Sequence, residues 1–197
     1  MIWDRLQEIE AAKAAIKSGY PTDGDFRSDN FLLDGLPLKN GGIILDFGCG
    51  IGRNTKYLVE KKKASGLNVE IYSYDFENMI KMAKDYLGEE NWKEVHWISH
   101  PLSNLAAIGQ DTEFDYIIAT VVFQHMKEAD LRSALMLLNK SLKDDGILAV
   151  YSRGYSDDGK KNVWGIIMDY FIPINNCDAE DSSEKHQRVM FTRGAVG

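Results

Sequence analysis

The chain has 197 residues, enough for one domain of ordinary size and for little beyond it. Hydrophobic residues make up 44% and charged residues 27%, which excludes a collagen-like or disordered chain. The formal net charge of −7 gives no support to a nucleic-acid partner, and two cysteines are too few for a disulfide framework.

The first residues of the chain carry acidic side chains where a targeting segment would be apolar. Asp4, Glu8 and Glu10 interrupt the apolar positions, so we expect no secretory signal. No apolar run approaches ~18 residues, the length that a membrane-spanning helix needs. We therefore expect a cytoplasmic protein without a membrane partner, and the sequence leaves its oligomeric state open.

The amino-terminal part of the chain precedes any strand pattern. Residues 3–17 have apolar positions at helical spacing, which predicts an amphipathic helix. Residues 19–41 are rich in Gly, Asp, Asn and Pro and predict a loop. We expect residues 1–41 either to cover a pocket as a lid or to pack a helix on the sheet edge.

From residue 42 onward, short apolar runs alternate with segments of helical periodicity. The runs lack polar alternation, as expected of strands buried on both faces of a parallel sheet. Strands are predicted at 43–45, 69–74, 95–99, 114–121 and 147–151, and helices at 53–63, 77–87 and 127–143. This order predicts a single α/β domain with a mostly parallel sheet.

The segment 153–197 has a less regular pattern than the core. A helix is predicted at 162–171 and a closing strand at 187–192. We predict no regular sixth strand, because the candidate at 172–175 is short and contains Pro173.

Three glycines, Gly48, Gly50 and Gly52, follow the first predicted strand. Glycines permit a tight turn and close approach of the backbone to a ligand, and a helix start favours a negatively charged group. Arg53 stands where the dinucleotide fingerprint has its third glycine, which argues against an NAD-linked oxidoreductase. Asp75 ends the next strand, 25 residues after Gly50, where a carboxylate can accept both hydroxyls of a ribose.

Four segments in this order resemble the motifs of class I S-adenosylmethionine-dependent methyltransferases. They are residues 43–54 (IILDFGCGIGRN), 75–84 (DFENMIKMAK), 114–126 (FDYIIATVVFQHM) and 142–151 (LKDDGILAVY). The resemblance implies a single Rossmann-like three-layer domain whose sheet includes an antiparallel C-terminal strand. It also implies a cofactor-binding core at 42–152 and an acceptor-side segment at 153–197.

The resemblance further implies which residues hold S-adenosyl-L-methionine and its product S-adenosyl-L-homocysteine. Gly48 and Gly50 would lie under the methionine and ribose portions, and Asp46 would orient the loop and the amino group of the cofactor. Asp75 would hold the ribose diol, and Phe76 would pack against the adenine. The other implied cofactor contacts are Phe47, Cys49, Asn54, Leu102, Ala119 and Thr120. No metal is expected.

Two positions depart from the family pattern. The family often has an acid after the third strand, near the adenine amino group, where this chain has Ser99 and His100. We expect the adenine contact to come from the backbone there or from His100. Asp75 also precedes Met79 by four residues, a shorter spacing than the resemblance leads us to expect.

The expected reaction is in-line methyl transfer to a small-molecule acceptor, at oxygen or nitrogen. His125 follows the fourth strand, where it would act as a general base for an acceptor hydroxyl or simply shape the pocket. Residues 119–123 lack the Asn/Asp-Pro-Pro-aromatic segment of enzymes that methylate the exocyclic amines of nucleic-acid bases. The alternatives are a non-catalytic protein of this fold that binds the cofactor or a nucleotide, and, less favoured, the oxidoreductase.

Overall fold

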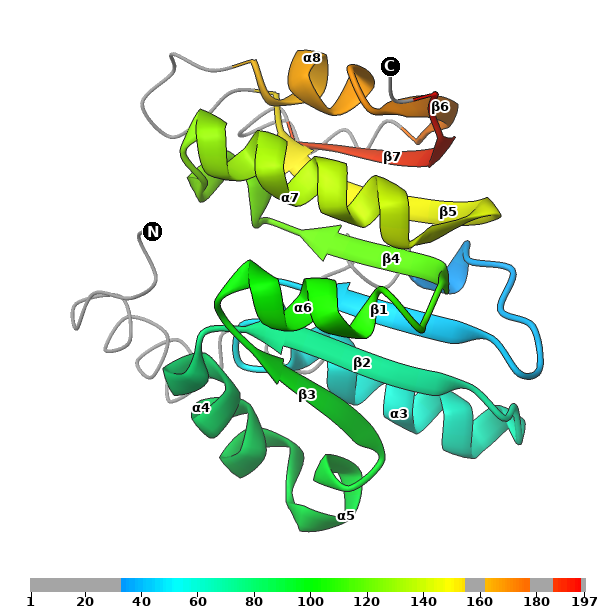
Figure 1. The fold of residues 1–197 in the computed structure, drawn as a ribbon. Coiled ribbons are helices and arrows are strands. Elements are labelled where there is room, and N and C mark those ends of the chain that lie inside the picture. The colour runs from blue at the N-terminus through cyan, green and yellow to red at the C-terminus, as the bar shows by residue number, and fades with distance from the viewer. Residues whose placement is uncertain (1–32, 155–161, 178–185, 196–197) are drawn as a thin grey trace.

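The computed structural model describes residues 33–154, 162–177 and 186–195, and within them seven strands form one sheet with helices on both faces (Figure 1). The strands are β1 (Ile43–Phe47), β2 (Glu70–Asp75), β3 (Val95–Ser99), β4 (Phe114–Thr120), β5 (Leu142–Arg153), β6 (Phe171–Cys177) and β7 (His186–Arg193). The helices are α3 (Arg53–Ser65), α4 (Glu77–Leu87), α5 (Glu89–Trp92), α6 (Leu102–Ile108), α7 (Glu128–Ser141) and α8 (Val163–Met168), with a 3-10 turn η2 (Phe123–His125). The helix predicted at 3–17 and most of the predicted loop and lid fall outside the described residues.

The strands lie in the order β3-β2-β1-β4-β5-β7-β6. Strands β1 to β5 pair in parallel, and β7 runs antiparallel between β5 and β6. The predicted α/β class, the mostly parallel sheet and the antiparallel C-terminal strand are confirmed.

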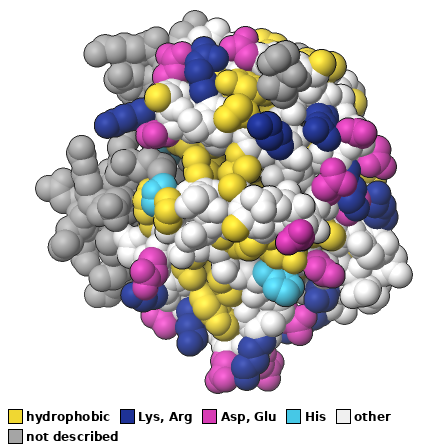
Figure 2. Space-filling model, viewed as in Figure 1, with side chains coloured by type: hydrophobic (Ala, Val, Ile, Leu, Met, Phe, Trp, Pro, Cys, Tyr) yellow, Lys and Arg dark blue, Asp and Glu magenta, His cyan; other side chains and the backbone are white. Residues whose placement is uncertain are grey.

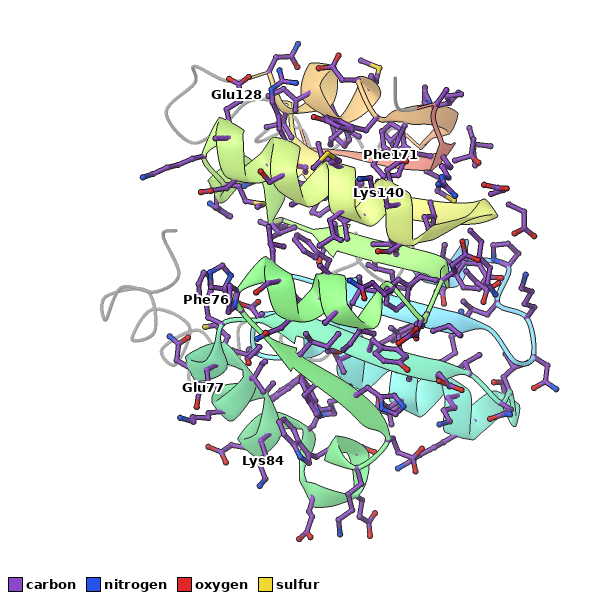
Figure 3. All side chains as sticks on the ribbon, in the orientation of Figure 1. Phe76, Glu77, Lys84, Glu128, Lys140 and Phe171 are labelled. Carbon is purple, nitrogen blue, oxygen red and sulfur yellow. The ribbon has the colours of Figure 1, made fainter. Side chains whose placement is uncertain are left out.

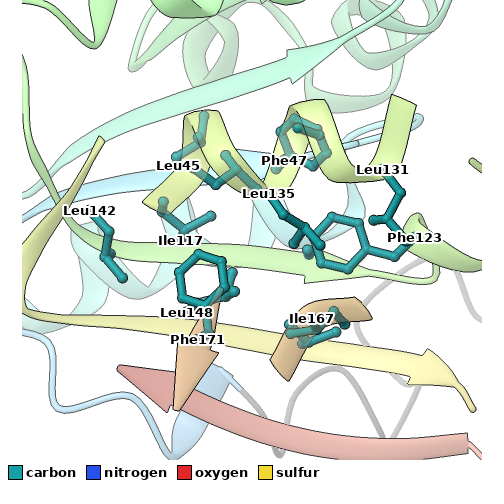
Figure 4. Packing of buried hydrophobic residues seen from close by; sticks show 14 of the residues in the cluster. Leu45, Phe47, Ile117, Phe123, Leu131, Leu135, Leu142, Leu148, Ile167 and Phe171 are labelled. Carbon is teal, nitrogen blue, oxygen red and sulfur yellow. The ribbon is translucent and has the colours of Figure 1, made fainter. Parts of the chain in front are cut away.

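Alternate residues of each central strand face opposite layers, because side chains alternate along a strand. Ile44 and Ile118 face the layer that contains α3 and α4, whereas Leu45 and Ile117 face the layer that contains α6, α7 and α8. Figure 4 shows the second layer, where leucines of α7 pack on β1, β4 and β5. The labelled members of this core are Leu45, Phe47, Ile117, Phe123, Leu131, Leu135, Leu142, Leu148, Ile167 and Phe171. Both faces of the sheet are covered, which explains the uninterrupted apolar runs of the sequence.

A sixth strand forms at one edge of the sheet, and it is irregular. Strand β6 includes Pro173 and pairs with β7, with a register shift between Pro173 and Asn175. Proline is tolerated because β6 is an edge strand, which has a partner on one side only.

Two predicted boundaries were wrong near the start of β5. The helix α7 ends at Ser141 rather than at residue 143, and β5 begins at Leu142 rather than at residue 147. The pairing jumps from Phe114 with Leu142 to Tyr116 with Ile147, so β5 carries a bulge that absorbs the extra residues. The short elements α5, α6 and η2 were not predicted, since none is long enough to show a clear period.

The buried carboxylate of Asp115, at the start of β4, joins three segments at the amino-terminal edge of the sheet. It accepts a hydrogen bond from the Ile43 backbone N–H at 2.9 Å and from Lys143 Nζ at 2.9 Å. Lys39 Nζ lies 2.8 Å from its other oxygen. Asp115 therefore ties the start of β1 to β4 and to the start of β5.

Replacing Asp115 by asparagine should lower the free energy of unfolding by about 1–3 kcal/mol, because charge-assisted hydrogen bonds to a buried acceptor are lost. Urea unfolding followed by tryptophan fluorescence measures the change. The matched control is Asp145→Asn, since Asp145 is exposed and lies 3.7 Å from Lys39. The control should change stability by less than about 0.5 kcal/mol, and equal losses in the two variants would contradict this role for Asp115.

In the described ranges, no helix combines the length and the apolar character needed to cross a membrane.

Candidate functional site

The carboxyl ends of β1, β2, β3 and β4 meet at one edge of the sheet because these strands are parallel. Figure 3 places Phe76, the residue after β2, at this edge, next to the start of α4. In open α/β sheets, ligands bind beyond the carboxyl ends of the strands. The turns after these four strands contain most of the site residues predicted from the sequence.

The glycine loop between β1 and α3 uses backbone conformations that favour glycine. Gly48, Gly50 and Gly52 have φ values of 73°, 58° and 83°. The N–H groups of Gly48 and Cys49 both donate to the Tyr74 carbonyl, at 2.8 and 3.1 Å. The loop is thus held on the end of β2.

The loop also packs against the turn that follows β4. A Cβ atom added to Gly48 would lie 2.8 Å from Val122 Cβ and closer still to one of its methyl groups. Val121, beside it, has a φ of 56°, a rare conformation for a β-branched residue. The close approach of the two turns therefore requires glycine at position 48.

Asp75 joins the glycine loop to the end of β2. Its Oδ2 accepts the Gly50 N–H at 2.7 Å, and its Oδ1 accepts the Phe76 N–H at 2.7 Å. Burial raises the pKa of this carboxyl to about 6, although the two N–H donors act in the opposite direction. A carboxylate can accept further hydrogen bonds, so additional donors at this position would stabilise its charged form.

This pKa predicts a specific pH dependence of stability. A carboxyl whose pKa is raised on folding binds more protons in the folded state between about pH 4 and 6, so its contribution to stability is lost as the pH rises through that window. The loss amounts to roughly 3 kcal/mol. The variant Asp75→Asn cannot titrate, so its stability relative to the wild type should rise by about that amount between pH 4 and 7.5. Urea unfolding at several pH values tests this, and a difference that stays constant with pH would contradict it.

Asp46, predicted to orient the loop, lies buried at the end of β1. Its Oδ2 accepts a hydrogen bond from the Thr55 hydroxyl at 2.7 Å, and that hydroxyl lies 2.8 Å from Ser73 Oγ. Asp46 therefore fixes α3 against β1 and β2. Thr55 and Ser73 were missed from the sequence, since Ser73 is brought beside Asp46 by the register between β1 and β2, and Thr55 by the packing of α3 on the sheet.

Asn54 and Thr120 connect the start of α3 to the end of β4. The Asn54 side-chain amide donates to the Thr120 hydroxyl at 2.6 Å. The next turn, η2, contains His125, and within it Gln124 Oε1 lies 3.4 Å from the Ser152 hydroxyl of β5. The structure thus brings Asn54, Thr120 and the turn with His125 to the same edge as Asp75.

Three predicted contact residues, Phe47, Cys49 and Ala119, have buried side chains. Phe47 stacks on Tyr74, with ring centroids 5.1 Å apart. Burial raises the pKa of the Cys49 thiol well above its ordinary value, which favours a packing role. These residues would therefore meet a ligand mainly through their backbone.

His100 lies at the carboxyl end of β3, beside Tyr74 of β2 and Phe76, the residue after β2. Its ring centroid is 4.6 Å from that of Phe76, and its Nδ1 lies 2.9 Å from the Tyr74 hydroxyl. Leu102, another predicted contact, begins α6 and packs against the core. Among the described residues, no three His, Cys, Asp or Glu side chains are grouped so that they could hold a metal ion.

A glycine loop, a strand-end carboxylate and a sheet of order β3-β2-β1-β4-β5-β7-β6 occur together in this chain, and known proteins share this fold. A family model described as "Methyltransferase domain" matches residues 44–146, which include the glycine loop, strands β2 to β4 and all of β1 but its first residue. The chain therefore belongs to this methyltransferase family, and the resemblance predicted from the sequence is confirmed.

Individual relatives agree with this family. The chain is 30% identical over 165 residues to the "Probable S-adenosyl-L-methionine-dependent methyltransferase TehB" of Haemophilus influenzae, covering 79% of this chain and 54% of that protein. The chain thus spans about half the length of that relative. A TehB-like SAM-dependent methyltransferase from Corynebacterium glutamicum has a TM-score of 0.68 at 19% identity, over 95% of this chain and 97% of the other. The N-methyltransferase NodS from Bradyrhizobium japonicum, solved with S-adenosyl-L-homocysteine, has a TM-score of 0.65 at 18% identity, over 86% and 87%.

Proposed function

We propose that this chain binds S-adenosyl-L-methionine and transfers its methyl group to a small-molecule acceptor, at oxygen or nitrogen. The observation that carries the proposal is the 2.7 Å hydrogen bond from the Gly50 N–H to Asp75, in a chain that belongs to a methyltransferase family. The buried Asp75 carboxyl has a raised pKa and can accept more donors. Two ribose hydroxyls are donors of the required kind, so the residues present fit this cofactor.

Other residues at the carboxyl edge of the sheet would bind the rest of the cofactor and act on the acceptor. Gly50 leaves room for close approach of the backbone, and Asn54 and Thr120 would present polar groups toward the methionine end. The bound cofactor supplies an activated methyl group. The chain then has to align the acceptor and exclude water, which can lower such a barrier by up to ~7–11 kcal/mol. His125, in the turn after β4, is the candidate base where the acceptor is a hydroxyl.

A small molecule is favoured as acceptor by charge and by sequence. The net charge is −7, and Lys and Arg side chains are interspersed with Asp and Glu on the face seen in Figure 2. The described side chains on this face therefore form no basic footprint of the kind that duplex binders carry. NodS is described as an N-methyltransferase, whereas a Streptococcus thermophilus protein of similar fold, with a TM-score of 0.62, is described as an rRNA methylase. The test therefore includes RNA.

The experiment incubates the protein with S-adenosyl-L-methionine labelled at the methyl group. Panels of small amines, hydroxyl compounds and carboxylates are compared with ribosomal RNA. Label transferred to a small molecule, and lost in Asp75→Ala, supports the proposal. Label transferred only to RNA would show that the acceptor is RNA rather than a small molecule. Binding of the cofactor without transfer to any acceptor would favour the non-catalytic alternative.

The spacing of one tyrosine and one lysine in the sequence favours the oxidoreductase alternative. A Tyr-x-x-x-Lys arrangement, found in short-chain oxidoreductases, occurs at Tyr57 and Lys61 of α3. The Tyr57 hydroxyl, however, donates to Asp34, and Lys61 Nζ donates to the Leu33 carbonyl at 3.3 Å. Both side chains are thereby used in holding the 33–34 segment on α3.

A further inference from the structure

The end of β5 brings helix α8 to the carboxyl edge of the sheet. Thr120 of β4 pairs with Tyr151 of β5, so the ends of these two strands lie side by side. Three residues further on, the Gly154 carbonyl accepts the N–H of Val163, the first residue of α8, at 3.0 Å. Strand β5 lies on the side of β4 opposite to β1, and β1 and β2 carry the residues proposed to hold the cofactor. Helix α8 is therefore tied to the side of the site that the acceptor would use.

The second residue of α8 is Trp164, whose indole N–H can donate a hydrogen bond but cannot accept one. Its Nε1 atom is buried, and no residue within 33–154, 162–177 and 186–195 accepts a hydrogen bond from it. The ring is held in place by stacking on Phe191 of β7, with centroids 6.1 Å apart and an interplanar angle of 26°. A buried donor without an acceptor is costly, and few such groups occur in native proteins, so this N–H indicates a partner from outside the fold.

The Trp164 indole N–H lies next to a glycine. A Cβ atom added to Gly154 would lie 3.4 Å from Trp164 Cδ1 and 3.7 Å from Nε1, so glycine leaves the space beside the donor without a side chain. Gly154 and Trp164 are both only partly buried. The donor therefore lies close to the molecular surface, at the end of β5, rather than in the centre of the core.

We propose that Trp164 binds the methyl acceptor by donating its indole N–H to an oxygen atom of that molecule. The assignment rests on the proposed function and adds a specificity-determining residue to it. The matching atom is a hydroxyl, carbonyl or carboxylate oxygen other than the atom that is methylated, since an indole N–H can only donate. An ammonium group also offers only donors and gains nothing from this residue. The site should therefore prefer acceptors with such an oxygen over oxygen-free amines of the same size.

The first experiment compares two tryptophans whose indole N–H groups differ in their partners. Trp97 Nε1 donates to the Trp92 carbonyl at 3.1 Å, and the Trp97 ring, like that of Trp164, is partly buried and stacked on another ring. Exchange of tryptophan for phenylalanine removes the same atoms at either position, but only Trp97→Phe breaks a hydrogen bond within the fold. Trp97→Phe should therefore lower Tm by about 2–4 °C more than Trp164→Phe does.

The second experiment measures methyl transfer to the best-labelled compound of the small-molecule panel. Trp164→Phe should raise the KM for that compound about three- to tenfold, the effect of one neutral hydrogen bond, and leave kcat and the dissociation constant of S-adenosyl-L-homocysteine within about twofold. Gly154→Ala should raise KM as well but keep Tm, because its Cβ would be in ordinary contact with the ring and occupy space beside the donor. Trp97→Phe is the control and should transfer methyl groups like the wild type.

Analogues of the same compound identify the atom that the indole N–H contacts. In each analogue, one oxygen that is not methylated is replaced by carbon. For one of them, the wild type should show the same rise in KM that Trp164→Phe shows for the parent compound. That analogue should lose nothing further in Trp164→Phe, because the hydrogen bond is already absent.

Three results would overturn the assignment. An unchanged KM in Trp164→Phe would remove Trp164 from the acceptor site and leave the proposed function standing. Equal losses of Tm in Trp164→Phe and Trp97→Phe would show that the Trp164 N–H has a partner within the fold. A wild type that binds S-adenosyl-L-homocysteine but labels no small molecule would overturn the proposed function, and this assignment with it.

Discussion

Asp75→Ala is expected to weaken the binding of S-adenosyl-L-homocysteine by at least about 100-fold, because hydrogen bonds from two hydroxyls to a charged acceptor contribute about 1.5–3 kcal/mol each. The variant also removes the acceptor of the Gly50 N–H, which holds the glycine loop at 2.7 Å from the carboxylate. Loss of ribose contacts and loss of loop order then act in the same direction. Calorimetric titration of the two proteins at pH 8, where the carboxyl is ionised, measures the difference.

The matched control for Asp75→Ala is Glu77→Ala. Glu77, labelled in Figure 3, is an acid two residues further along, at the start of α4. Its exposed side chain pairs with Lys81 at 2.8 Å. We expect its removal to leave the dissociation constant within about twofold, since an exposed pair of this kind contributes little. Asp75→Ala binding within a few-fold of the wild type, with the fold intact by circular dichroism, would contradict the role of the carboxylate.

Gly48→Ala should lower the free energy of unfolding by about 2–5 kcal/mol and abolish cofactor binding. A side chain in the left-handed region costs about 1–2 kcal/mol, and overpacking in a closed contact adds about 1–3 kcal/mol. Both apply to Gly48, whose φ is 73° and whose added Cβ would lie 2.8 Å from Val122 Cβ. Thermal and urea unfolding give the loss of stability, and calorimetry gives the loss of binding.

Two further variants distinguish the cost of the left-handed backbone conformation at residue 48 from the cost of the steric clash with Val122. Gly41 has a φ of 76°, but an added Cβ would meet nothing within 4 Å. Gly41→Ala should therefore lower the free energy of unfolding only by the cost of a side chain in the left-handed region, about 1–2 kcal/mol. It should keep cofactor binding. Val122→Ala combined with Gly48→Ala should recover part of the stability that the single variant loses. Equal losses in Gly41→Ala and Gly48→Ala would show that the contact with Val122 is unimportant.

The central strands and the site edge could be predicted because their signals are local. Apolar runs such as 43–45 and 114–121 have no polar alternation, and this follows from burial on both faces of the sheet. Gly50 and Asp75 were associated through the spacing of a strand-loop-helix-strand unit, and the structure joins them by a hydrogen bond. In both cases a short sequence pattern reflects one physical constraint.

Several contacts of the site and the edge strand β6 could not be predicted, because they depend on how the strands pair and on their position in the sheet. The contact between Tyr74 and His100 arises because β2 and β3 are neighbours with Tyr74 opposite Ile98, which no single-segment pattern indicates. Pro173 argued against β6 only while its place in the sheet was unknown, and at an edge the objection no longer applies. The contact of Thr55 with Asp46 likewise requires α3 to be placed on β1.

Thermal unfolding of the wild type with S-adenosyl-L-methionine, S-adenosyl-L-homocysteine or NAD tests most directly whether this edge is a methyl-donor site. A ligand at ~100 times its dissociation constant adds about 2.7 kcal/mol of stability. For a chain of this size, that corresponds to a rise of roughly 5–10 °C in Tm. We predict such a rise with both sulfur ligands and none with NAD. No rise with either sulfur ligand, or a rise with NAD alone, would contradict the assignment of the site.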